Sequence, residues 1–350
     1  EPLFGGTTSF SGGGLWIPNN RWQREAGIAD SREEALEYAC RLANKAGVRP
    51  LIERYLDQCN PCLDFLEAQT EIRFEAAVGH PDYRMEVPGS RAHGRGVAQG
   101  AFDTNRLGEL KGSIRRGWAT SGLTSNESYA ARHGDRIKFD LPTIRADRER
   151  AGFIGMGAAL VGFLLEGCLR KGAGLFSGAR AVQLLRPRER VSGVVIERAG
   201  ERQTVAVRSG VVLACGGFEW NPALVDRFLG VPMAAPASPG HNVGDGLRMA
   251  LGVGAGLGTM TEAWWNMLYT NPGDEYEGRQ LHRTTSDIRG QPGMICVNRS
   301  GRRFVNEALN YHDLGKSMYE FDPGAYEYPN TPAFLAVSYT HLTLPTILRV

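Results

Sequence analysis

Apolar residues recur with a helical period in several stretches of the first half of the chain. After Asp30, Ser31 and Glu34 have the spacing of a capping box, in which each side chain bonds the backbone N–H of the other residue at a helix start. The helix that follows is predicted to bury one face, made of Ala35, Leu36, Ala39, Leu42 and Ala43. The most apolar helix is predicted over 156–171, ending at Gly172.

Two shorter helices are predicted at about 50–58 and 61–68. The break falls at Asn60-Pro61, because Asn is a favoured N-cap and Pro is favoured at the first helical position. This step lies within a Cys-x-x-Cys pattern and would place Cys62 in a first helical turn, where the pKa of a thiol can fall. The six cysteines are irregularly spaced, and neither a second such pair nor a partner histidine accompanies Cys59 and Cys62. We therefore expect no disulfide framework and no metal site.

Short runs rich in Val, Leu and Ile predict strands in the middle of the chain. They lie at 71–74, at 181–185, in a hairpin of 191–197 with 203–207, and in a buried strand over 210–214 that stops at Cys215-Gly216-Gly217. An apolar strand that ends at paired glycines after a hairpin is typical of a nucleotide-binding α/β domain rather than of a sandwich. From Glu262 onward aromatic, glycine and polar residues mix without a helical period, which predicts a second domain beginning there.

Charge and hydropathy exclude several functional classes. Lys and Arg number 40 against 38 Asp and Glu, for a net charge of +2, so we expect no nucleic-acid partner. The most apolar stretch, 155–169, contains Glu166 and is shorter than a membrane span, so no transmembrane segment is predicted. No signal peptide is visible, and the expected location is cytoplasmic, with association to a membrane surface left open.

Glycine, with 45 residues, clusters at defined places, as expected where backbone must approach a ligand closely. The first cluster is the stretch FGGTTSFSGGGLW at 4–16. Bare backbone N–H groups and hydroxyls suit a large, flat, anionic ligand, and a flexible Gly/Ser linker is the alternative. The bulky run Leu15-Trp16-Ile17 follows at once, which favours the ligand loop. Its candidate residues are Gly5, Gly6, Thr7, Thr8, Ser11, Gly12, Gly13 and Gly14.

Two further glycine sites follow. Small residues that end the strand at 210–214 would let backbone lie against a dinucleotide, although glycine is common at strand ends. A third site precedes a helix predicted from about Leu247, and an ordinary Asp-Gly turn is its alternative. These two sites comprise Ala214, Cys215, Gly216 and Gly217, then Asn242, Gly244, Asp245 and Gly246. Gly155-Met156-Gly157 also precedes a helix, but position 160 is Leu and no clear strand comes before it, so we reject it as a dinucleotide turn.

Taken together, these motifs resemble the FAD-dependent fumarate reductase and 3-ketosteroid dehydrogenase flavoproteins. The matching stretches are GGTTSFSGGGLWIP at 5–18, LACGGFEWN at 213–221, NVGDGLRMALGVGA at 242–255 and MICVNRSGRRFVNEALNYHD at 294–313. The resemblance implies FAD as cofactor and an α/β fold, with a Rossmann-like FAD-binding domain over 1–261 and an inserted α+β substrate or cap domain over 262–337. All three glycine sites would bind FAD, together with Ala181 and Val182. It also implies that the first βαβ unit is missing before Glu1 and that 338–350 is a non-native tail.

Tyr311 distinguishes among the members of this family. The fumarate reductases carry an Arg at the corresponding position, and a Tyr cannot replace a fixed cation there. The 3-ketosteroid Δ1-dehydrogenases use a Tyr as the proton-abstracting base, so the resemblance implies that role for Tyr311. The segment from Gly79 to Gly89 resembles their second active-site tyrosine segment and implies a catalytic Tyr83, although Arg84 stands where a His is expected. For either tyrosine, a packed aromatic with a satisfied hydroxyl is the alternative.

The implied reaction is a 1,2-dehydrogenation beside the ketone of a 3-oxosteroid. The base removes a proton next to the carbonyl, while flavin N5 takes a hydride from the adjacent carbon. An apolar, steroid-like ketone and an electron acceptor are then the partners. The pocket candidates, which could equally be packing residues, are Trp264, Trp265, Met267, Leu268 and Tyr269.

The residues leave other activities open. A 3-oxosteroid Δ4-dehydrogenase and a fumarate-reductase-like enone reductase are alternatives within the family. A third hypothesis is an inactive fragment that binds no flavin.

Overall fold

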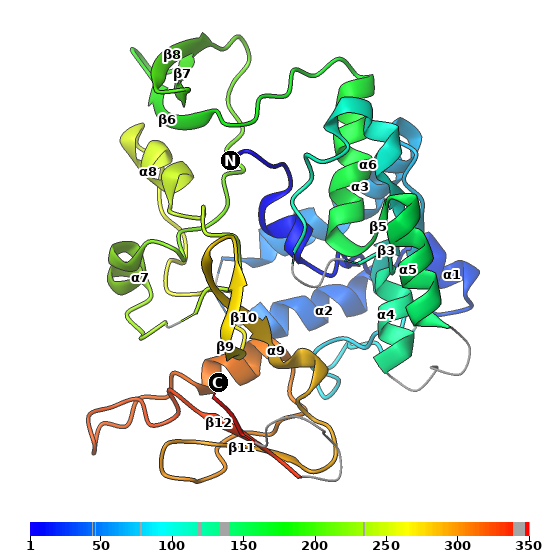
Figure 1. Ribbon diagram of the computed structural model, residues 1–350, viewed down its shortest axis with the longest axis vertical. Helices are drawn as coiled ribbons and strands as arrows, with labels where there is room; N and C mark the ends of the chain where they lie inside the picture. Colours follow the sequence, from blue (N-terminus) through cyan, green and yellow to red (C-terminus); the bar gives the residue numbers. More distant parts are fainter. Residues whose placement is uncertain are drawn as a thin grey trace. The chain divides into compact units, whose positions relative to one another are not determined.

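The computed structural model describes residues 1–43, 45, 47–77, 79–117, 121–132, 140–233, 235–338 and 347–349 (Figure 1). The chain divides into two compact units, residues 1–178 and 179–350. The second unit contains residues from both sides of the predicted domain boundary at 261/262, and that boundary stays a prediction. Most of the predicted tail at 338–350 falls on 339–346 and 350, outside the described residues.

The first unit is mainly helical. Its helices are η1 (Gly6–Phe10), α1 (Arg21–Glu25), α2 (Arg32–Ala43), α3 (Arg49–Gln69), η2 (Thr104–Leu110), α4 (Ser125–Arg132), α5 (Leu141–Ala151) and α6 (Met156–Arg170). Its strands are β1 (Leu15–Trp16), β2 (Phe74–Ala76), β3 (Gly96–Gln99), β4 (Phe102–Asp103) and β5 (Phe153–Ile154). β3 pairs with both β1 and β2, and β4 pairs with β5, in antiparallel register throughout.

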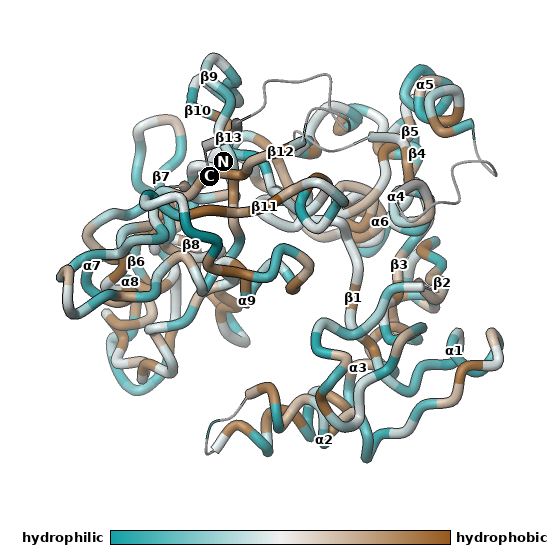
Figure 2. The backbone as a smooth tube through the Cα atoms, turned by 90° about the horizontal axis from the view of Figure 1, so that it is seen from below, coloured by the Kyte–Doolittle hydropathy of each residue, from teal (hydrophilic) through white to brown (hydrophobic). Residues whose placement is uncertain are grey.

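Helix α2 begins as its sequence predicts. The Ser31 hydroxyl donates to Glu34 Oε2 at 2.9 Å and accepts the backbone N–H of Glu34 at 3.2 Å. The buried face differs from the prediction in one respect, because Leu42 is 44% exposed while Tyr38 is buried. Figure 2 shows hydrophobic and hydrophilic residues interleaved along α2, as expected for a helix with one covered side.

The predicted break at Asn60-Pro61 is wrong, because α3 runs through Pro61 without interruption. The Asn60 side chain does not cap a helix; it donates to the carbonyl of Pro18 at 3.0 Å. Cys59 and Leu63 are buried in the core on either side of the proline, and this packing offsets the hydrogen bond that Pro61 cannot make. Cys62 therefore lies in a helix interior, and not in a first turn.

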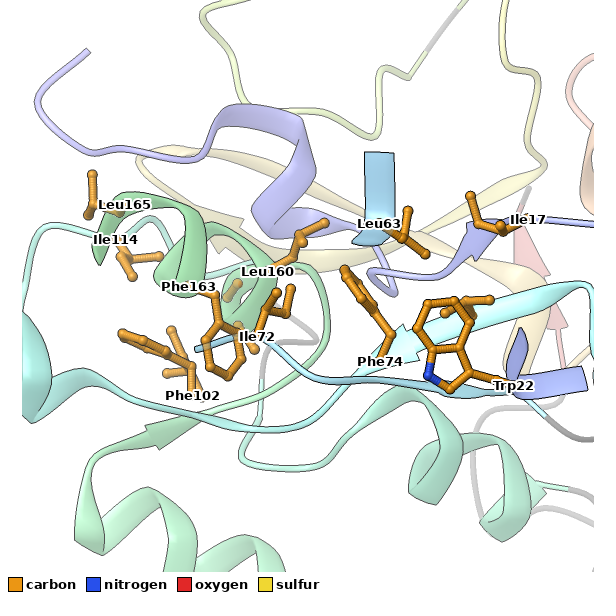
Figure 3. Packing of buried hydrophobic residues seen from close by; sticks show 14 of the residues in the cluster. Ile17, Trp22, Leu63, Ile72, Phe74, Phe102, Ile114, Leu160, Phe163 and Leu165 are labelled. Atoms are coloured by element: carbon orange, nitrogen blue, oxygen red, sulfur yellow. The ribbon is translucent and has the colours of Figure 1, made fainter. Parts of the chain in front are cut away.

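Helix α6 is the centre of the first unit's core (Figure 3). Phe102 from β4 and Phe163 from α6 meet edge to face, with ring centroids 4.9 Å apart. Gly162 makes this approach possible, since a Cβ there would stand 2.3 Å from the Phe102 ring. The helix spans nearly the predicted residues, whereas the strand expected at 71–74 begins at Phe74.

The second unit contains small antiparallel sheets and short helices. Its strands are β6 (Arg180–Leu185), β7 (Gly193–Arg198), β8 (Glu201–Ala206), β9 (Leu268–Tyr276), β10 (Arg279–Thr284), β11 (Met294–Val297), β12 (Phe334–Val337) and β13 (Ile347–Arg349). Its helices are α7 (Pro222–Phe228), α8 (Asp245–Gly252), η4 (Thr285–Asp287) and α9 (Tyr311–Ser317). The sheets have the orders β6-β7-β8, β10-β9 and β11-β12-β13. The β7–β8 hairpin confirms the prediction, and Met267, Cys296, Leu314 and Leu335 lie in a second buried core.

The buried strand predicted at 210–214 is not observed. Residues 210–217 form no strand, and Val212 is 92% exposed. An apolar run becomes a strand only beside a partner that offers free backbone groups, and among the described residues no strand pairs with it. All the sheets among the described residues are antiparallel. The described residues therefore show a mixed α/β class without the parallel sheet of a Rossmann-type domain.

Candidate active site

The glycine-rich loop at the start of the chain folds into the short helix η1. Gly5 precedes it with φ +115°, and a Cβ on Gly5 would stand 1.9 Å from Ser9 Oγ, so the turn requires glycine. The buried Ser9 and Gly13 hold the loop to the protein. Of its candidate ligands, Gly5 and Gly6 are half-buried, and five face solvent, namely Thr7, Thr8, Ser11, Gly12 and Gly14.

This loop packs on the start of α6. The backbone N–H of Gly157 donates to the Ser11 carbonyl at 3.0 Å, and a Cβ on Gly157 would stand 1.9 Å from the Thr8 carbonyl. Gly13, with φ +73°, would bring a Cβ within 2.7 Å of the Met156 backbone. The rejected Gly155-Met156-Gly157 motif is therefore where the loop packs. The closely spaced glycines before the helix indicate in the sequence that backbone approaches closely there. No sequence pattern indicates that the approaching segment is the first loop.

The second and third glycine sites form one cluster in the second unit. The backbone N–H of Gly244 donates to the Gly217 carbonyl at 3.1 Å, and a Cβ on Gly246 would stand 3.1 Å from the Cys215 Cβ. Asn242 is buried beside them and donates to Glu219 Oε1 at 2.6 Å. Residues 214–217 are exposed, so the cluster has one open side.

Asp245 anchors this cluster to β6. It is the first residue of α8, which packs against β6, the strand that carries the half-buried Ala181 and Val182. Arg180 donates to both carboxylate oxygens at 2.7 and 2.8 Å, and Arg248 adds a bond at 2.8 Å. Hydrogen bonding to Arg180, with help from Arg248, lowers the pKa of Asp245 and keeps it ionised.

Tyr311 opens helix α9. The side-chain oxygen of Asn310 caps the helix by accepting the backbone N–H groups of His312 and Asp313 at 3.1 and 3.0 Å. Tyr311 itself is half-buried, and its phenol oxygen accepts a hydrogen bond from the indole N–H of Trp264. The cap and this bond together fix the position of the ring.

A buried carboxylate orders the chain that leads to Tyr311. Glu307 is 4% exposed, accepts the backbone N–H of Cys296 at 2.7 Å and pairs with Arg303 at 2.6 Å. Burial acts to raise the pKa of Glu307, but the Arg303 pair and the backbone donor outweigh it and lower that pKa. Arg289 donates to the carbonyls of Glu307 and Leu309. No local sequence pattern predicts this anchor.

Tyr83 lies in the first unit and is 54% exposed. Its neighbour Asp82 is buried, pairs with Arg95 at 2.8 Å and accepts the Trp16 indole N–H at 2.8 Å. Arg95 also forms a forked pair with Asp30, through bonds of 2.9 and 2.7 Å. This buried network joins residues far apart in sequence, and no local pattern predicts it. It fixes the segment that carries Tyr83.

The predicted pocket residues divide into core and surface. Met267 is 2% exposed and lies in the core of the second unit, and Trp265 is buried with its ring 4.8 Å from that of Tyr319. Trp264, in contrast, is 81% exposed. Leu268 and Tyr269 begin β9 and are half-buried. Only the middle of this segment is therefore core.

The described residues contain no group of His, Cys, Asp and Glu that could hold a metal ion. Within the same ranges, no helix combines the length and the apolar character needed to cross a membrane.

Comparison with known proteins identifies relatives along nearly the whole chain. A family described as FAD binding domain matches residues 1–334. The chain is 35% identical over 348 residues to 4-oxocyclohexanecarboxylate 2-dehydrogenase of Sinomonas cyclohexanicum, covering 97% of this chain and 59% of the relative. It is 31% identical over 355 residues to 3-oxosteroid 1-dehydrogenase of Mycobacterium tuberculosis H37Rv, covering 95% and 62%. The chain thus spans about three fifths of these relatives' length.

Solved structures give a consistent result. The 3-ketosteroid Δ1-dehydrogenase of Sterolibacterium denitrificans, solved in complex with 1,4-androstadiene-3,17-dione, superposes with a TM-score of 0.85 at 28% identity, covering 97% of this chain and 63% of that protein. A flavocytochrome c3 fumarate reductase shares the fold, with a TM-score of 0.57 at 17% identity, covering 94% and 46%. The family match and these flavoenzymes support FAD as the cofactor.

Proposed function

The chain belongs to the FAD binding domain family, and on that premise we propose that it is an FAD-dependent dehydrogenase that introduces a C=C bond beside a ring ketone. The observation that carries this proposal is Tyr311, a half-buried phenol at the start of α9 whose oxygen is held by an N–H donor. Relatives over nearly the whole chain support it, since their names describe dehydrogenation of cyclic ketones.

Two sets of residues fit FAD, one in each unit. In the first unit the exposed hydroxyls and bare glycines of the loop over 5–14 suit its phosphates and ribityl chain. The side chain of the buried Gln99 lies next to Gly13 of this loop. Its oxygen, Oε1, has no hydrogen-bond partner among the described residues. In the second unit the open side of the 214–217 and 242–246 cluster offers bare backbone. FAD, when bound, supplies the hydride acceptor.

Tyr311 is proposed as the general base. Its phenolate takes the hydrogen next to the carbonyl as a proton, and the adjacent carbon gives up a hydride, so the substrate loses two hydrogens and two electrons. An external acceptor must finally take those electrons. A free phenol has a pKa near 10, and a phenol that works as a base at neutral pH therefore needs donors that stabilise its ionised form.

Tyr83 is proposed as a second catalytic tyrosine. It is 54% exposed, and the buried Asp82–Arg95 pair next to it holds the backbone of its segment in place. The family resemblance of its segment is the other support.

The leading substrate candidate is a 3-oxosteroid, dehydrogenated at the 1,2 bond. The relatives named 3-oxosteroid 1-dehydrogenase and the structure solved with an androstadienedione favour it. A monocyclic keto acid is the second candidate, because the relative at 35% identity is named for 4-oxocyclohexanecarboxylate. Both contain a cyclohexanone ring, so the proposed chemistry at the reacting carbons is common to both.

The proposal is tested by adding a 3-oxosteroid, or 4-oxocyclohexanecarboxylate, to the FAD-loaded protein with an artificial electron acceptor. We expect a product that lacks two hydrogens, with its new double bond at the 1,2 position of the steroid or conjugated with the ketone of the keto acid. A double bond at the 4 position would instead assign a Δ4-dehydrogenase, and activity only as an enone reductase would assign the fumarate-reductase type. Protein without flavin absorbance, even after incubation with FAD, would favour an inactive fragment.

A further inference from the structure

Trp264 is an exposed aromatic residue with a specific hydrogen bond. Its side chain is 81% exposed, so burial of apolar surface does not explain its position. Its indole N–H donates to the phenol oxygen of Tyr311, and an indole can only donate. The phenol oxygen is therefore the acceptor in this bond, which is the polarity that favours its ionised form.

The segment that carries Trp264 is held against α9 by contacts on both sides of it. Before it, Glu262 pairs with Lys316 at 2.9 Å. After it, the buried Trp265 packs on Tyr319, just beyond the end of α9, with ring centroids 4.8 Å apart, and Asn266 donates to Thr284 of β10 at 3.2 Å. These contacts limit the freedom of the backbone at 264.

Gly315 allows this close approach. A Cβ at Gly315 would stand 2.7 Å from the backbone nitrogen of Asn266 and 2.9 Å from Trp265, so a larger residue would push the segment away. Positions 311, 315 and 319 are spaced four residues apart. The first two share one face of α9, and the third follows just after the end of the helix. The same face therefore presents Tyr311 and seats the segment that brings its donor.

We propose that Trp264 is the residue that activates Tyr311, by donating its indole N–H to the phenolate that removes the substrate proton. This inference rests on the proposed function, since it assigns a partner to the base of that reaction. A flat apolar ketone that covers the exposed indole would shield the bond from water, and a shielded hydrogen bond to an ionised oxygen is stronger than one in solvent.

A substitution at Trp264 leaves the other charged and titratable groups near Tyr311 in the protein. Lys316 and Glu262 form a pair and offset each other, and Asp313 and His312 follow on α9. Burial and the nearby Lys316 lower the pKa of His312, which keeps it neutral near pH 7. Arg289 bonds carbonyls of the preceding segment. A change in the pH profile caused by Trp264→Phe therefore reports the loss of the indole N–H.

The test compares Trp264→Phe, which keeps an aromatic ring but loses the donor, with the parent protein. We expect kcat on the ketone to fall about tenfold to a hundredfold, the usual worth of one hydrogen bond to a charged group. KM should change little, and the rate should rise at a higher pH than in the parent. Tyr326→Phe is the matched control, because Tyr326 is an equally exposed aromatic, at 83%, in the same unit. It should leave both quantities unchanged.

A second readout is independent of turnover. The ultraviolet absorbance of phenolate is titrated in protein without flavin, and the curve of a Tyr311→Phe variant is subtracted to isolate Tyr311. We expect Trp264→Phe to move this isolated titration to higher pH. An unmoved titration overturns the role of Trp264 even if the proposed function holds. If Tyr311→Phe itself keeps full activity, the assignment of the base fails instead, so the two failures are distinguishable.

Discussion

Gly216 lies against Asn242, and a Cβ on Gly216 would stand 2.5 Å from Asn242 Oδ1. The backbone at Gly216 has φ +77°, which residues with a side chain rarely adopt. This contact joins two motifs that are separate in the sequence and makes them one cluster. Gly216 therefore has a structural requirement for glycine as well as a place in the proposed FAD site.

Gly216→Ala is expected to weaken FAD binding. The left-handed backbone costs an alanine about 1–2 kcal/mol, and the clash with Asn242 adds to it, which corresponds to roughly fivefold to thirtyfold weaker retention. Equilibrium dialysis with FAD measures this. Gly256→Ala is the control, because a Cβ there meets nothing within 4 Å and its φ is not positive. Equal loss in both variants would contradict the assignment.

Arg95→Met is expected to destabilise the protein by about 3–5 kcal/mol, because it removes the buried cation that pairs with Asp82 and Asp30 and leaves Asp30 only a longer contact, of 3.7 Å, with Arg91. Chemical denaturation followed by circular dichroism gives the free energy of unfolding. Arg41→Gln removes an ion pair with Glu37 in which the side chains are 56% and 46% exposed, and should cost no more than about 1 kcal/mol. Similar losses in the two variants would show that the buried network contributes little.

The predictions from sequence succeeded where local rules decide the structure. The capping box at Ser31, the apolar helix α6 and the β7–β8 hairpin are all specified by neighbouring residues. They failed where packing between distant segments decides, as in α3, which continues through Pro61 because its flanking residues are buried. The strand expected at 210–214 failed for a related reason, since a strand needs a partner that its own sequence does not name.

The candidate site shows the same division. The glycine motifs can be recognised in the sequence because backbone without a side chain requires glycine. Folding alone brings together the residues of three other features. These are the packing of the first loop on Gly157, the contacts of Glu307, and the Arg95 network. The Trp264 donor to Tyr311 likewise has no signature in the sequence beyond an aromatic pair.

Reaction with a thiol reagent should separate the cysteines by position. Burial raises the pKa of Cys59, and raises that of Cys296 to about 12, so both should react slowly. Cys62, Cys168 and Cys215 are exposed and should react quickly. Because Cys215 belongs to the proposed FAD cluster, FAD should slow its labelling and leave Cys62 and Cys168 unaffected. Mass spectrometry of peptides measures this, and uniform labelling with and without FAD would count against the cluster.

Acid should weaken the second unit through Glu307. Its pKa is lowered in the folded protein below the ordinary 4.5, so its stabilising contribution is complete above that value and is lost as the pH falls toward the folded value. Glu307→Gln should lower the free energy of unfolding at neutral pH by about 1–3 kcal/mol. It should also flatten the dependence of stability on pH below 4.5. An unchanged slope in denaturation series across this range would show that another group is responsible.

The most direct test of the central claim is anaerobic mixing of the FAD-loaded protein with a 3-oxosteroid, or with 4-oxocyclohexanecarboxylate, while the flavin absorbance is followed. With one of these ketones the parent protein should bleach rapidly as hydride leaves the substrate. Tyr311→Phe should retain FAD and the folded structure yet bleach about a hundredfold to ten-thousandfold more slowly, the usual contribution of a general base. Bleaching at the parent rate in Tyr311→Phe would contradict the account.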